Sequence, residues 1–98
     1  YDLAISINAW CFEENGVLNK EKMDLFLNSY GKIRKIEEDE LKSIRLLCIG
    51  ACLRFLSTRL FDFFNQNKEA EVKVKDPQEY LDKLKFHLQV KSYKEYLL

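Results

Sequence analysis

Two arginines are the residues whose type and setting most readily suggest chemistry. Arg54 and Arg59 lie in a largely apolar stretch, LKSIRLLCIGACLRFLSTRLFDFF (41–64). A buried guanidinium needs an anion, because an unpaired buried charge is very costly. At about 100° per residue the two side chains lie about 140° apart around a helix, so each one needs its own partner.

Two kinds of partner fit these arginines. Either arginine could bind the carboxylate of a small substrate, since guanidinium and carboxylate groups form paired hydrogen bonds. We therefore treat Arg54 and Arg59 as candidate substrate-binding residues. Alternatively each arginine forms a structural ion pair with an acidic residue of this chain. Asp2 would then neutralise one arginine, and either Asp62 or an acid of the last helix would neutralise the other.

Other constellations that support catalysis are missing from the sequence. The three glycines are scattered and form no phosphate-binding loop. The single histidine, His87, lies on an amphipathic segment, where we expect it to pack rather than to transfer protons. Asp62 begins a sequence like the metal-binding Asp-Phe-Gly of kinases, but Phe64 replaces the glycine. Residue chemistry alone therefore predicts that this chain is not a complete enzyme.

Charge and cysteine content exclude several further classes. Sixteen basic and sixteen acidic residues cancel, which argues against a nucleic-acid or anionic-membrane surface. No apolar run reaches the roughly 20 residues of a membrane span, and no basic signal region opens the chain. Cys11, Cys48 and Cys52 have no histidine nearby that would complete a zinc site. We expect three buried, reduced thiols, no metal site and a cytoplasmic protein.

Helical periodicity predicts an all-α fold. Apolar residues recur at helical spacing in four segments, whereas alternation of isoleucine with polar residues makes a strand the rival interpretation near the N-terminus. Asn15-Gly16 predicts a turn, and Asn19 and Asp76 are good helix caps. Residues 68–75 are expected to form an extended linker. The predicted helices cover about 2–12, 20–33, 37–65 and 77–97, and the third is the central one.

Three stretches resemble homoserine kinases of the aminoglycoside phosphotransferase and choline kinase superfamily. They are YDLAISINAWCF (1–12), ACLRFLSTRLFD (51–62) and VKDPQEY (74–80), and they agree with the family in order and spacing. The resemblance covers the whole chain. The departures are mild: Lys35 replaces a common proline, and Ile49 stands where a charged residue is frequent.

The resemblance implies a fold and a reaction. Residues 1–98 would be one helical subdomain, the C-terminal part of a protein-kinase-like phosphotransferase. The parent enzyme would transfer the γ-phosphoryl group of ATP to the hydroxyl of L-homoserine, in threonine biosynthesis. In the family the nucleotide lobe, the catalytic loop and the metal-binding Asp lie upstream of Tyr1. ATP and Mg²⁺ would therefore bind to a missing N-terminal portion, which would be the partner of this chain.

The resemblance also nominates residues on the acceptor side of the cleft. Trp10 aligns with a tryptophan of the choline pocket in choline kinases, which implies a place beside homoserine, although a core position would also suit an indole. Asn8 would hydrogen-bond the substrate or hold its helix. The alternative function is a stand-alone helical interaction module or a non-catalytic relic, without a large exposed apolar patch. A fragment, by contrast, could self-associate to cover its exposed face.

Overall fold

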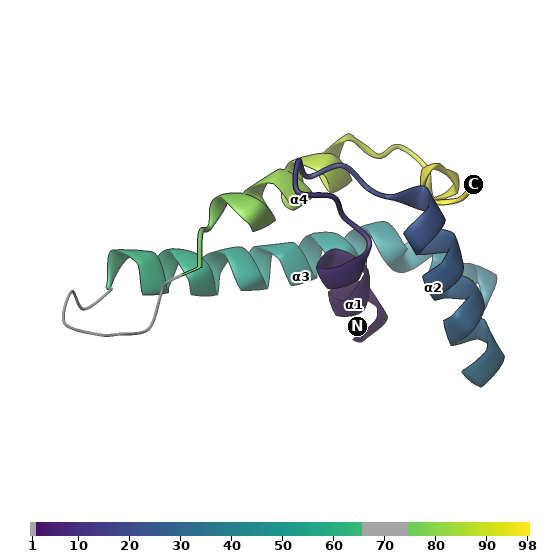
Figure 1. Cartoon of the computed structure of the whole chain (residues 1–98). Coiled ribbons are helices and arrows are strands. Elements are labelled where there is room, and N and C mark those ends of the chain that lie inside the picture. The colour runs from purple at the N-terminus through teal and green to yellow at the C-terminus, as the bar shows by residue number, and fades with distance from the viewer. Residues whose placement is uncertain (1, 66–74) are drawn as a thin grey trace.

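The computed structural model describes residues 2–65 and 75–98, and this part of the chain is all-α (Figure 1). A short 3₁₀ helix follows the α-helices near the C-terminus. Within the described ranges the extended pairing is limited to one bridge between Phe12 and Leu18. The predicted linker 68–75 lies, apart from Lys75, outside the described residues. The helices are α1 (Asp2–Trp10), α2 (Lys20–Ile33), α3 (Glu38–Phe64), α4 (Gln78–Gln89) and η1 (Tyr93–Tyr96).

The long helix α3 is the element against which the others pack. Figure 1 shows α4 running alongside α3 and α1 lying across it, and η1 contacts α3 as well. Glu38, Asp39 and Glu40 occupy the first turn of α3, where the helix dipole favours negative charge. The predictions of an all-α fold, of a central helix in this range and of a helix rather than a strand in α1 are therefore confirmed.

The cap at Asn19 and the turn between α1 and α2 form as expected, whereas the predicted cap at Asp76 is wrong, because Pro77 is the N-cap of α4 and the helix begins at Gln78. The side chain of Asn19 accepts a hydrogen bond from the Lys22 amide, 3.0 Å away. Gly16 has a φ of 79°, which favours glycine, and its amide donates to the carbonyl of Glu13. Asp76 accepts from the amide of Gln78 at the start of α4. The bonds to the amides of Lys22 and Gln78 satisfy helix-start amides that have no partner within the helix.

The last helix is shorter than the sequence predicted. Instead of reaching about residue 97, α4 ends at Gln89, because Val90 adopts an extended backbone. The chain then re-forms as η1, which Ser92 and Glu95 begin with a reciprocal capping box. The apolar spacing of the C-terminal tyrosines suggested a continuous helix, but the local capping bonds stop it. The break lets Tyr96 turn back into the core, where it is almost fully buried.

The core has two parts along α3. The larger one joins α1, the start of α2, the N-terminal half of α3 and η1, and the smaller one joins α3 to the beginning of α4. All three cysteines are buried and free, as predicted. The buried members of the larger part are Leu3, Ala4, Ile7, Cys11, Leu18, Met23, Ile44, Cys48, Ala51, Val90 and Tyr96; those of the smaller part are Cys52, Tyr80 and Leu84.

Candidate functional site

A buried polar cluster ties α1, α3, α4 and η1 together. The ring nitrogen Nε2 of His87 lies 2.8 Å from Asn8 Oδ1, and Nδ1 lies 2.7 Å from the Tyr96 hydroxyl. Because the amide oxygen of Asn8 can only accept, Nε2 carries the ring proton, and Nδ1 accepts from Tyr96. Asn8 Nδ2 donates to the carbonyl of Cys48, 3.1 Å away. The cluster therefore joins four elements through one neutral imidazole.

The environment keeps His87 neutral near pH 7. Burial, together with the nearby positive charges of Arg45 and Lys83, lowers the pKa of its imidazole to about 4. Burial also raises the pKa of the Tyr96 phenol well above its usual value. Neither group is suited to proton transfer at neutral pH. The predicted packing role of His87 agrees with this geometry, although the ring is fully buried and hydrogen-bonded at both nitrogens.

Lys83 is a buried cation beside this cluster. The residue is only 4% exposed, and its Nζ donates to the backbone carbonyl of Asn8 at 2.5 Å and to Glu79 at 3.2 Å. Its ammonium also lies 4.7 Å from the ring centre of Tyr80. The sequence pattern did not predict a buried lysine here. The sequence feature that could have indicated it is Glu79, four residues before Lys83, because a Glu that precedes a Lys by four residues favours a helical ion pair.

Arg59 is held by the start of α4. Its guanidinium donates to the carboxylate of Glu79 and to the carbonyl of Asp76, 3.3 Å away, and it lies 4.4 Å above the ring centre of Tyr80. The Arg59 side chain is 14% exposed. Burial would raise the pKa of the Glu79 carboxyl, but hydrogen bonds from Arg59 and Lys83 outweigh it and lower that pKa. The acid facing Arg59 thus comes from the last helix, which was one of the two predicted structural partners.

Among the described residues, Arg59 pairs with Glu79 and not with Asp2 or Asp62. Arg54 is exposed on α3, and Asp62 is exposed near the end of the same helix. Asp2 lines a small pocket between α1, α2 and α3, and the arginine in that pocket is Arg34. Within the described residues, Arg59, Asp2 and Asp62 therefore do not form one site.

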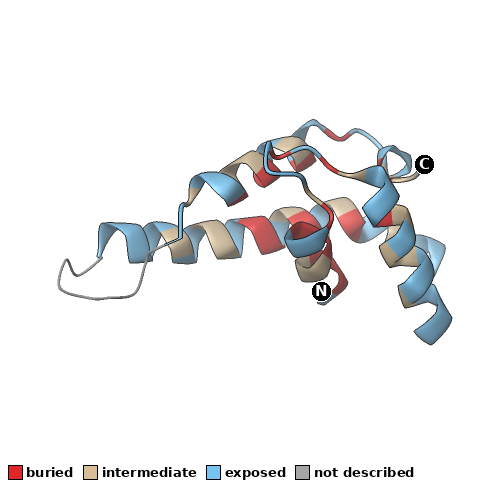
Figure 2. Cartoon of the chain, in the orientation of Figure 1, coloured by how far each residue is buried: buried red, intermediate tan, exposed pale blue. Residues whose placement is uncertain are grey.

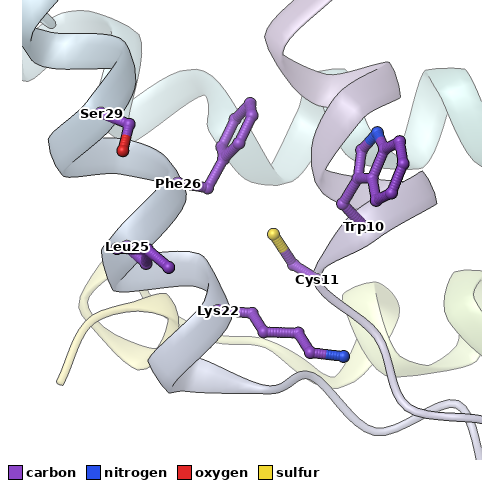
Figure 3. A pocket seen from close by; sticks show the side chains of 6 residues that line it. All are labelled: Trp10, Cys11, Lys22, Leu25, Phe26 and Ser29. Atoms are coloured by element: carbon purple, nitrogen blue, oxygen red, sulfur yellow. The ribbon is translucent and has the colours of Figure 1, made fainter.

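Trp10 lies at the rim of an open, mainly apolar pocket between α1 and α2. The pocket has a volume of about 470 Å³, and Trp10 is 72% exposed (Figure 3). Trp10 is therefore not part of the core formed by the described residues. Lys22 contributes the ammonium group of the pocket and lies 3.9 Å from Glu13. Burial raises the pKa of the Cys11 thiol, which remains protonated at neutral pH. The lining residues are Trp10, Cys11, Lys22, Leu25, Phe26 and Ser29.

Asn8 does not line this pocket. It is fully buried, its side chain bonds to Cys48 and His87, and its carbonyl accepts from Lys83. Of the two roles considered for Asn8, holding its helix is the one that these contacts describe. In the described parts of the chain, no three His, Cys, Asp or Glu side chains gather as metal ligands would. Among the helices described, none is long and apolar enough to cross a membrane.

Comparison with known proteins gives a consistent set of relatives. The chain is 49% identical to a homoserine kinase of Bradyrhizobium diazoefficiens over 96 residues, which is 98% of the chain and 29% of that enzyme. It is 51% identical over 92 residues to a homoserine kinase of Afipia carboxidovorans, covering 94% of the chain and 28% of the enzyme. It is also 51% identical over 87 residues to a homoserine kinase of Paramagnetospirillum magneticum, covering 89% of the chain and 27% of the enzyme. No protein-family model matches the chain.

Proposed function

We propose that this chain is the C-terminal, acceptor-side portion of a homoserine kinase. The observation that carries the proposal is the near-50% identity to homoserine kinases along 98% of the chain. The chain spans less than a third of the length of these relatives. The proposed reaction of the complete enzyme is transfer of the γ-phosphoryl group of ATP to the hydroxyl of L-homoserine.

The nucleotide and its metal belong, in this proposal, to the part of the enzyme that this chain does not span. Phosphoryl transfer depends on Mg²⁺ and on a carboxylate that orients the attacking hydroxyl. The carboxylates of the described residues do not gather into a metal-binding group, and Glu79 is engaged by Arg59 and Lys83. We therefore assign ATP and Mg²⁺ to the upstream portion and assign positioning of the acceptor to this chain.

On the acceptor side, Arg54 is the residue we assign to the substrate carboxylate. Both arginines were candidates, and we choose Arg54 because it is exposed and accessible to a ligand, whereas the Arg59 side chain is only 14% exposed. A guanidinium can bind a carboxylate through two hydrogen bonds, which a lysine cannot reproduce. Trp10, exposed at the rim of its pocket, would form an apolar wall beside the bound substrate.

The alternative, a stand-alone helical module, fits the structure less well. That alternative predicts a surface without a large apolar patch. Instead, exposed leucine and phenylalanine side chains recur along α3. Monomeric soluble proteins rarely expose such surfaces, which usually mark an interface.

A chimeric enzyme tests the proposed function. Residues 1–98 would replace the matching segment of the Bradyrhizobium diazoefficiens homoserine kinase, and phosphorylation of L-homoserine, choline and an aminoglycoside would be measured with ATP. We expect activity on L-homoserine, and none from the 98-residue chain alone. A chimera that phosphorylates choline or the aminoglycoside but not homoserine would show that the substrate assignment is wrong.

A further inference from the structure

The helix α3 has an apolar face that points away from the rest of the fold. At 3.6 residues per turn, positions 46, 50, 53, 57, 60, 61 and 64 fall on one side of a helix. Apart from Ser57 these positions carry glycine or large apolar side chains. All of them are exposed, and Figure 2 shows exposed residues recurring along α3 to its C-terminal end. We define the outer face of α3 as Leu46, Gly50, Leu53, Leu60, Phe61 and Phe64.

The opposite face of α3 is already covered. Its buried residues Ile44, Cys48, Ala51 and Cys52 pack against α1, α4 and η1. The helix is thus apolar on two opposite sides, and only one of them has a partner within the described residues. An amphipathic surface helix would instead turn polar side chains outward. The outer face therefore has the composition of a buried surface in an exposed position.

We infer that the outer face of α3 is the docking surface for the remaining polypeptide of the homoserine kinase. This inference rests on the proposed function. The relatives are more than three times as long as the matched segment, since that segment is 27–29% of each of them. The rest of such an enzyme must pack against this chain somewhere. On α3 the inner face is filled, so the outer face is the side that remains.

Two details of the outer face suit a packed protein partner. A Cβ atom built at Gly50 would meet no atom within 4 Å, so the space beside this glycine is open to a neighbouring polypeptide. The apolar residues extend over about five turns, from Leu46 to Phe64, which is long enough for a helix or a strand to lie along them. A second copy of this chain could also cover the face, and the experiment below distinguishes the two occupants.

The inference places Arg54 at the junction of the two parts. On the helical projection Arg54 lies next to Gly50 and Phe61, at one edge of the outer face. Docking of the upstream portion along this face would bring that portion's surface to the guanidinium of Arg54. An arginine at such a junction can bind an acceptor that sits between the two parts of the enzyme. The docking surface therefore deepens the proposed role of Arg54 in substrate binding.

Thiol labelling measures docking directly, because the native cysteines are buried. The probe variant is Leu53→Cys, at the centre of the outer face, where the leucine is 49% exposed. The matched control is Leu88→Cys on α4, where the leucine is 55% exposed. Both variants would be made in the 98-residue chain and in the chimera with the upstream portion of the Bradyrhizobium diazoefficiens enzyme. A maleimide would label each protein at several protein concentrations.

We expect both variants to react at similar rates in the 98-residue chain. In the chimera the labelling rate of Leu53→Cys should fall roughly tenfold or more, as at the core of a protein interface, while that of Leu88→Cys stays unchanged. An unprotected Leu53→Cys in a chimera that phosphorylates homoserine would overturn the inference and leave the proposed function intact. A chimera that does not form one compact folded body would also overturn it.

The remaining outcomes separate the two occupants and the two proposals. Protection of Leu53→Cys in the 98-residue chain that rises with concentration, together with a dimer by light scattering, would identify a second copy as the occupant and overturn the inference. Protection in a chimera that phosphorylates a different alcohol would support the docking surface while contradicting the homoserine assignment. In that case only the proposed function fails.

Discussion

The imidazole Nε2 of His87 donates to Oδ1 of Asn8, 2.8 Å away, across 79 positions of the chain. This bond joins α4 to α1, and the other ring nitrogen joins α4 to η1 through Tyr96. Asn8 continues the connection into α3 through the carbonyl of Cys48. A fully satisfied buried network of this kind fixes the relative positions of its elements, because each group left unpaired would be costly.

Truncation of Asn8 should therefore destabilise the chain strongly. Asn8→Ala leaves the Nε2 proton of His87 and the carbonyl of Cys48 without their partner in the core. We expect a loss of about 2–4 kcal/mol in the free energy of unfolding, measured by urea denaturation. The control is Asn28→Ala on the exposed side of α2, which should change stability by less than about 0.5 kcal/mol. Equal effects of the two substitutions would contradict the role of Asn8.

Acid should weaken the fold through the same histidine. The pKa of His87 is lowered from 6.5 to about 4 in the folded chain, so below pH 6.5 the unfolded chain binds more protons than the folded one. The contribution of His87 to the free energy of unfolding is then fully present above pH 6.5. It declines as the pH falls toward 4, by roughly 3 kcal/mol in total. Urea denaturation at pH 7.5 and 4.5 measures this loss. His87→Gln should flatten the dependence in this window, and an unchanged slope would assign it to other groups.

The contacts of Arg59 with the start of α4 should contribute less to the free energy of unfolding than Asn8 does. Arg59→Lys removes the stacking of a planar guanidinium on Tyr80 and weakens the contacts with Asp76 and Glu79. Because Glu79 is 53% exposed, solvent screens the ion pair, and we expect a loss of about 1 kcal/mol. Thermal unfolding measures it. In the chimeric enzyme the same substitution should leave the KM for homoserine unchanged, and a large rise in KM would show that Arg59 binds substrate.

The native thiols should react slowly while the chain is folded. Burial raises the pKa of Cys48 to about 12 and that of Cys52 to about 11, so little reactive thiolate is present at pH 8. We expect maleimide labelling at least roughly 100-fold slower than in 6 M urea, followed by mass spectrometry. Fast labelling of Cys48 in the folded chain would mean that α3 opens from α1.

Periodicity predicted the helices better than it predicted their contacts. The apolar spacing located α1, α2 and α3, because burial of one face dictates which residues repeat. It overextended α4, since the pattern through Tyr93 and Tyr96 continues while the capping box at Ser92 breaks the helix. A spacing pattern indicates which apolar residues are buried, but it does not indicate whether the helix ends before those residues reach the core.

The polar contacts were harder to predict because they join distant segments. Lys83 looks like a surface residue in the sequence, yet it is buried where the carbonyl of Asn8 and the carboxylate of Glu79 converge. An acid of the last helix was one anticipated partner of Arg59, since a buried guanidinium demands an anion, but only the fold selected Glu79 over Asp62. Residue types therefore show that a buried arginine requires an anion, whereas the packing of α3 against α4 determines which acid pairs with it.

Replacing Arg54 tests the assignment of the substrate carboxylate. In the chimeric enzyme, Arg54→Lys keeps the positive charge but loses the two-pronged geometry of the guanidinium. We expect the KM for L-homoserine to rise roughly tenfold at an unchanged unfolding temperature, because lysine keeps the positive charge but cannot reproduce the two hydrogen bonds to the carboxylate. The KM for ATP should stay constant, since we assign the nucleotide to the upstream portion. A lowered unfolding temperature with an unchanged KM for homoserine would instead make Arg54 a structural residue of the docked interface.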